Sequence, residues 1–93
     1  MADYLDSNDE AVAGLIAAYD ALVARAESYE QSIEEQFEAA NRDGKVKHAR
    51  HVGTGRRNVR LLLDLLEEDV LEAVMRLKDN QHHIRMSREG KLV

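Results

Sequence analysis

The sequence contains no cysteine, no proline and no tryptophan, and only five glycines among 93 residues. Without cysteine the chain has no disulfide and no thiolate chemistry, and its first residues lack the basic start of a signal peptide. Both absences favour a cytoplasmic protein. No run of about eighteen apolar residues is present, so no membrane contact is expected. With one phenylalanine and three tyrosines, a large aromatic core is excluded.

What remains is rich in alanine, leucine, glutamate and arginine, a composition typical of long helices and coiled coils. The length allows one domain, covering residues 1–93. Residues 1–43 hold eleven acidic side chains and two arginines, whereas residues 44–93 hold eleven basic and seven acidic side chains. This asymmetry predicts that the two halves pack against each other or against a second copy. The net charge of −5 argues against non-specific coating of DNA.

A first helix is predicted from about residue 8 to about residue 42. Ser7 and Glu10 have the spacing of an N-terminal capping box, and Gly44 suits a left-handed helix end. Apolar residues follow at helical spacing in two rows. The first row is Val12, Tyr19, Ala26, Ile33 and Ala40, and the second is Leu15, Leu22 and Tyr29, followed by the polar Gln36. Two adjacent rows make a stripe wider than a two-stranded coiled coil needs, which indicates packing in a bundle.

A second helix is predicted from about residue 56 to about residue 87, closed by Gly90. Its expected core stripe is Val59, Leu63, Leu66, Val70, Ala73, Leu77 and Ile84, flanked by Leu62 and Val74. Residues 43–55 between the helices are expected to form a basic connector, because Gly53 and Gly55 break helices. The predicted fold is therefore all-α, a long antiparallel hairpin that pairs into a four-helix bundle as a homodimer or higher oligomer. A monomer in which the connector forms a third helix is the alternative.

A second apolar patch on the back of the second helix is the predicted partner-binding surface. Four exposed apolar residues in one cluster indicate a contact surface, and two glutamates border them. The patch consists of Leu61, Leu65, Leu71 and Met75, with Glu68 and Glu72 at its rim. The predicted function is that of a small non-enzymatic regulatory, inhibitor or adaptor protein that binds another protein through this helical face.

The connector supports an alternative function, the binding of a nucleotide or nucleic acid through its phosphates. Residues 45–60 carry six bases and no acid, and glycines before a helix start allow backbone N–H groups to face an anion. The candidate anion-binding residues are Lys45, Lys47, Arg50, Gly53, Thr54, Gly55, Arg56, Arg57 and Arg60. The segment lacks the Gly-Lys-Ser/Thr ending of a phosphate-binding loop, so the motif is weak.

No arrangement of residues indicates catalysis, a cofactor or a metal. His48 and His51 lie far along the chain from His82 and His83, and no HExxH motif accompanies them. The acidic residues fall on polar helix faces, where solvation is the expected role. The four serines have no histidine and acid at a recognisable spacing. We therefore expect neither catalytic residues nor metal ligands.

Overall fold

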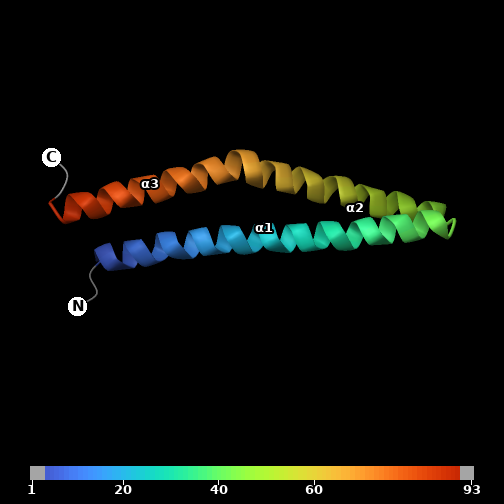
Figure 1. The fold of residues 1–93 in the computed structure, drawn as a ribbon, viewed down its shortest axis with the longest axis horizontal. Helices are drawn as coiled ribbons and strands as arrows, with labels where there is room; N and C mark the ends of the chain where they lie inside the picture. Colours follow the sequence, from blue (N-terminus) through green and yellow to red (C-terminus); the bar gives the residue numbers. More distant parts are fainter. Residues whose placement is uncertain (1–3, 91–93) are drawn as a thin grey trace.

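The protein is a two-armed helical hairpin in the computed structural model, which describes residues 4–90. The first arm is α1, Tyr4–Arg42, and the second is formed by α2, Val46–Leu65, and α3, Leu71–Arg88. A short π-helical segment, Leu66–Val70, joins α2 to α3 without a break in the helix. The arms run antiparallel over a length of 66 Å, and both described chain ends lie at the same end of the hairpin (Figure 1). The predicted all-α hairpin is thus confirmed.

In the turn at the far end of the hairpin, a glycine in the left-handed conformation ends the first helix, as expected. Gly44 has a φ of 71°. The Lys45 N–H donates to the Ala40 carbonyl and the Gly44 N–H donates to the Asn41 carbonyl, at 2.9 and 3.2 Å. These two hydrogen bonds form a Schellman motif, which satisfies carbonyls that the helix leaves unpaired. The predicted left-handed cap at Gly44 is confirmed, and Gly90, with a φ of 73°, plays the same role after α3.

Two predicted boundaries are wrong. α1 begins at Tyr4, so Ser7 and Glu10 lie inside the helix and do not cap it. The connector predicted for residues 43–55 is reduced to Asp43–Lys45, because α2 begins at Val46 and includes both glycines. The alternative prediction, that the connector forms a third and separately packed helix, is also wrong. Residues 46–55 instead belong to α2 and extend the second arm (Figure 1).

The glycines stay helical because they allow the arms to approach closely. A Cβ atom on Gly53 would lie 3.3 Å from the Phe37 ring, and one on Gly55 would lie 3.3 Å from Cδ1 of Ile33. Glycine in a helix costs about 1 kcal/mol relative to alanine. Contact between the arms outweighs this cost here, because Gly53 is buried and Ile33 lies in the core.

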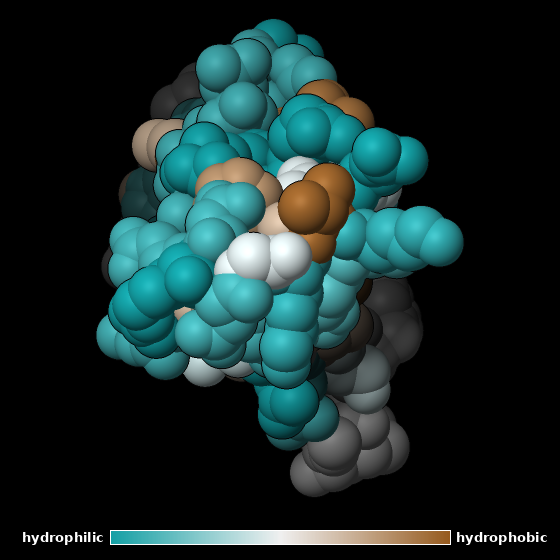
Figure 2. Space-filling model, turned by 90° about the vertical axis from the view of Figure 1, so that its right-hand side faces the viewer, coloured by the Kyte–Doolittle hydropathy of each residue, from teal (hydrophilic) through white to brown (hydrophobic). Residues whose placement is uncertain are grey.

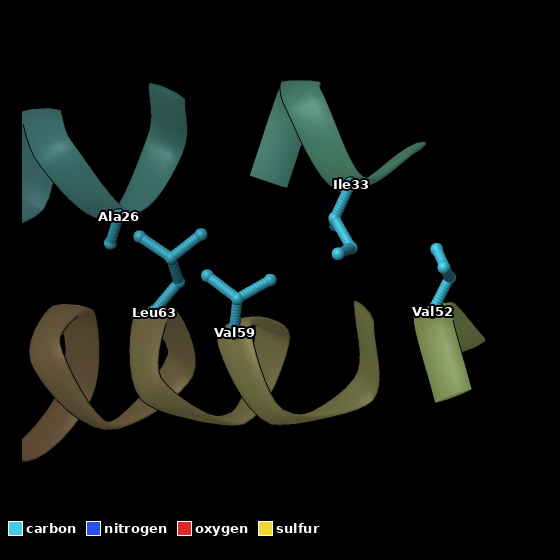
Figure 3. Close-up of a cluster of buried hydrophobic side chains, with 5 residues drawn as sticks. All are labelled: Ala26, Ile33, Val52, Val59 and Leu63. Atoms are coloured by element: carbon cyan, nitrogen blue, oxygen red, sulfur yellow. The ribbon is translucent and has the colours of Figure 1, made fainter. Parts of the chain in front are cut away.

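The core is a single layer between the arms in the half of the hairpin near the turn. It contains Ala26 and Ile33 from α1 and Val52, Val59 and Leu63 from α2, whose side chains point toward one another (Figure 3). The first predicted row of α1 and the beginning of the predicted stripe on α2 therefore face each other as expected. Leu66, at 3% exposed, ends this part of the core.

Beyond Leu66 the predicted stripe is wrong for Val70, Ala73 and Leu77, which are exposed, because the π-helical segment changes the helix phase, whereas Ile84 is half-buried. The N–H of Leu71 donates to the carbonyl of Leu66, five residues back, which adds one residue to the turn. After this point the half-buried Val74 and the buried Gln81 face α1, whereas Ala73 and Leu77, expected in the core, are exposed. The second arm also bends here, with the apex of the bend pointing away from α1 and α3 slanting back toward it (Figure 1).

Tyr19 contacts the segment that bends. Its hydroxyl donates a 2.8 Å hydrogen bond to the carbonyl of Leu66, the same oxygen that receives the Leu71 N–H. A side chain that bonds to a helix carbonyl is a recognised cause of helix bending. The change of phase in the second arm thus coincides with a tertiary contact from the first.

Candidate functional site

The structure gathers four of the six predicted partner-binding residues in one place. Glu68, Leu71, Glu72 and Met75 line a shallow groove at the start of α3, together with Glu67, Arg76 and Asp79. We call these seven residues the acidic groove. Leu61 and Leu65 are exposed on α2 but do not line it. The back patch inferred from the sequence is therefore divided, since the π-helical segment lies between its two halves.

The acidic groove combines an apolar lining with negative charge. Leu71 is 37% exposed and Met75 is 59% exposed, so both offer apolar surface to a partner. Four of the lining residues are acidic and one, Arg76, is basic. Arg76 pairs with Glu72 at 2.7 Å along the same helix. A partner that fills the groove would need apolar side chains together with positive charge.

The predicted anion-binding residues do not form a cradle. The N–H groups of Gly53 and Gly55 belong to α2, inside the helix, and both glycines face α1. The hydroxyl of Thr54 donates to the carbonyl of Arg50, one turn back in the same helix. The premise of a glycine loop that precedes a helix start is therefore wrong, because the helix begins nine residues earlier than position 55.

Two of the predicted anion-binding arginines are engaged with carboxylates of α1. Arg56 and Arg60 each lie 2.5 Å from Oε1 of Glu34, and Arg60 also lies 3.7 Å from Glu30. The guanidinium of Arg56 is stacked 4.8 Å from the centre of the Phe37 ring. The hydrogen bond from Arg56, helped by the charge of Arg60, holds the pKa of Glu34 below its usual range. This cluster joins the arms and leaves little of Arg56 for a ligand.

The remaining bases lie exposed near the turn. Lys45, Lys47, Arg50 and Arg57 are all on the surface, and Arg57 donates to the Thr54 hydroxyl at 3.2 Å. Figure 2 looks at this end of the molecule, where hydrophilic side chains cover most of the surface around a small apolar spot. These four positively charged side chains are therefore exposed to solvent at the turn end of the hairpin.

One surface was not identified as a site from the sequence. Six exposed apolar side chains follow the length of the hairpin, three on each arm, and we call them the apolar flank. They are Leu15, Leu22 and Tyr29 on α1, and Leu62, Val70 and Leu77 on the second arm. The signal in the sequence was the second apolar row of the first helix, which the hairpin leaves uncovered.

The apolar flank lies on the side of the hairpin opposite the Glu34 cluster. Tyr29 and Glu30 come three and four residues after the buried Ala26, so helical geometry puts them on either side of the core row. Tyr29 borders a small hollow with Gly55 and Leu62. Leu62 follows the buried Val59 by three residues, just as Leu77 follows the half-buried Val74, and both therefore project to the same side.

The open end of the hairpin holds a polar contact between α1 and α3. Asp9 accepts a hydrogen bond from the buried Gln81 and a 3.0 Å hydrogen bond from Arg88. The bond from Gln81, with the smaller effect of Arg88, lowers the pKa of Asp9. A hollow of about 220 Å³ lies beside this contact, lined in part by Val12, Ile16 and His82. These bonds join the arms where apolar burial is thin.

Within residues 4–90 the structure groups no set of three metal-binding side chains. His82 and His83 lie edge to face, with ring centres 5.8 Å apart, and His83 approaches Asp79 at 3.6 Å. None of the helices described has an apolar stretch of the length that a bilayer requires. Comparison of the chain with protein-family models, with curated proteins and with solved structures returned no match.

Proposed function

We propose that the chain is a small non-enzymatic protein, of a regulatory, inhibitor or adaptor type, that acts in the cytoplasm by binding another protein through its helical surface. The observation that carries this proposal is the acidic groove, in which apolar and acidic side chains predicted to bind a partner lie together. Exposed apolar surface in a cluster, bordered by polar residues, is typical of protein-binding sites.

We also propose that two hairpins pair into a four-helix bundle. Support comes from the poor enclosure of the single hairpin. No large side chain in the described residues is fully buried, and eleven large apolar side chains there remain exposed. A chain this short gains little stability from one thin core, and association is a common remedy.

The binding of a phosphate-bearing ligand at the turn end stays the alternative. The exposed Lys45, Lys47, Arg50 and Arg57 support it, although the glycine cradle on which it rested does not form. Binding through phosphates would weaken steeply as the salt concentration rises, which separates it from binding through apolar contacts.

Affinity capture from a native lysate tests the two functions. Leu71→Asp with Met75→Asp places charge in the acidic groove, and Lys47→Ala with Arg50→Ala is the matched control at the turn end. We expect the wild type and the control to capture a protein that stays bound after nuclease treatment. The groove variant is expected not to capture it. A nucleotide or nucleic acid that is retained by the groove variant and lost with the turn-end variant would favour the alternative.

A further inference from the structure

The apolar flank is a continuous surface with a regular repeat. Leu15, Leu22 and Tyr29 are spaced seven residues apart, which is two helical turns, and they are 55%, 45% and 50% exposed. The alternating positions of the same heptad are occupied by Ala11, Ala18, Arg25 and Ser32. None of these positions is acidic, although α1 carries nine acids. A seam of this kind is built to pack against another helix.

The second arm continues the same surface, and the π-helical segment makes this possible. From Leu62 to Val70 the spacing is eight residues, and from Val70 to Leu77 it is seven. Two turns of α-helix take about seven residues, and the π-helical segment between Leu62 and Val70 adds one more residue. The spacing of eight therefore keeps all three side chains on one side of the arm. Without the segment, Val70 and Leu77 would follow Leu66 into the core and the flank would end at Leu62.

The register between the arms brings the six side chains into three levels. Glu30 pairs with Arg60, Glu34 with Arg56 and Asp9 with Gln81. By this register the six side chains of the apolar flank fall at three successive levels along the hairpin, one from each arm at each level. The pairs are Tyr29 with Leu62, Leu22 with Val70, and Leu15 with Leu77. A partner that covers all three levels must be about as long as the hairpin.

We infer that a second copy of this chain covers the apolar flank, with α1 of each copy lying on the α2–α3 arm of the other and both turns at the same end. This inference rests on the proposed pairing of two hairpins. The broad side of the hairpin measures 66 by 26 Å, or roughly 1,700 Å². A stable interface of standard size buries about 800 Å² on each partner. Contact over half of the broad side would therefore bury enough area for a stable dimer.

The difference in charge between the two arms favours one relative orientation of the two copies. α1 contains nine acids and two arginines, whereas residues 46–88 contain nine bases and six acids. If the copies ran in opposite directions, α1 would lie on α1 and the two acidic helices would repel each other. With both turns at the same end, each acidic α1 lies against a basic arm of the other copy. The same two-fold arrangement repeats each contact twice.

Sedimentation of three proteins at micromolar concentration tests the interface. The wild type is expected at twice its chain mass of 10.5 kDa. Leu22→Glu puts a charge in the centre of the flank and is expected to raise the dissociation constant on the order of a hundredfold. Leu61→Glu is the matched control, because Leu61 is also exposed but lies off the flank. It is expected to stay dimeric, with unchanged helix content by circular dichroism.

The outcomes separate the interface from the pairing itself. A monomeric wild type would overturn both the pairing and this inference. A dimeric wild type that Leu22→Glu leaves intact and Leu61→Glu dissociates would keep the pairing and overturn the flank. If both variants unfold or dissociate alike, the flank assignment is also overturned.

Cross-linking tests the orientation, and the absence of native cysteine makes it clean. Under mild oxidation, an equal mixture of Leu22→Cys and Val70→Cys chains is expected to form the mixed covalent dimer faster than either chain alone forms its own. Rapid cross-linking of Leu22→Cys to itself would show α1 on α1 and would overturn the arrangement proposed here.

Discussion

Replacing glycine by alanine at three positions is expected to change the free energy of unfolding in three different ways. Gly14 lies within α1, and a Cβ atom there would meet nothing within 4 Å. Alanine is favoured over glycine in a helix by about 0.8–1 kcal/mol. With no clash to oppose this gain, Gly14→Ala should stabilise the protein by about that amount.

Replacing Gly44 by alanine should change the free energy of unfolding in the opposite direction. Its φ of 71° lies in the left-handed region, where a Cβ atom approaches the following carbonyl. This conformation costs a non-glycine residue about 1–2 kcal/mol. The surroundings are open, so the backbone is the only source of the penalty. Gly44→Ala should therefore destabilise the protein by about 1 kcal/mol or slightly more.

The change in the free energy of unfolding for Gly55→Ala should lie between those for Gly14→Ala and Gly44→Ala. Alanine gains the same helix preference there, because Gly55 is inside α2. Its Cβ atom, however, would lie 3.2 Å from the hydroxyl of Tyr29 and 3.3 Å from Cδ1 of Ile33. Ile33 is 7% exposed and has little room to move. The crowding should offset the gain, so Gly55→Ala should be less stable than Gly14→Ala by about 1 kcal/mol or more.

Urea denaturation followed by circular dichroism at 222 nm measures all three changes, at one fixed protein concentration because association would contribute to stability. The reasoning fails if Gly55→Ala stabilises as much as Gly14→Ala, since the arms would then not approach closely. It also fails if Gly55→Ala destabilises the protein as much as Gly44→Ala does, since Gly55 would then behave as a glycine in a loop. That result would restore the loop expected from the sequence.

Three further outcomes follow from the contacts between the arms. Leu66→Ala should cost about 2–5 kcal/mol in urea denaturation, because the side chain is 3% exposed, and a change under about 1 kcal/mol would exclude Leu66 from the core. Tyr19→Phe removes the hydrogen bond to the Leu66 carbonyl and should cost about 0.5–1.5 kcal/mol by the same assay, whereas no change would mean that the bond adds nothing. Acidification should lower the melting temperature as the pH falls below about 4, because hydrogen bonds from Arg56 and Gln81 lower the pKa values of Glu34 and Asp9 in the folded state. Groups with lowered pKa values stabilise the fold above their unfolded pKa and lose that contribution on protonation, so Glu34→Gln with Asp9→Asn should flatten this dependence.

The hairpin and the half of its core near the turn could be predicted from local rules alone. The row from Val12 to Ala40 and the residues Val59, Leu63 and Leu66 repeat at helical spacing, and Gly44 meets the steric demand of a left-handed helix end. These features depend on the chain's own periodicity and backbone sterics. The surplus of apolar rows was visible for the same reason, although the sequence did not tell which of them a single hairpin would leave exposed.

The tertiary structure decided the rest, because contacts between the arms overrode local preference. Gly53 and Gly55 disfavour a helix on their own, yet both lie inside α2, where a Cβ atom would crowd Phe37 or Ile33 at 3.3 Å. The change of phase after Leu66 has no local signal in the sequence. It coincides with the hydrogen bond from Tyr19, 47 residues away along the chain. Because of that one added residue in the turn, Val74 and Gln81 face α1, and Leu77, which helical spacing assigned to the core, is exposed.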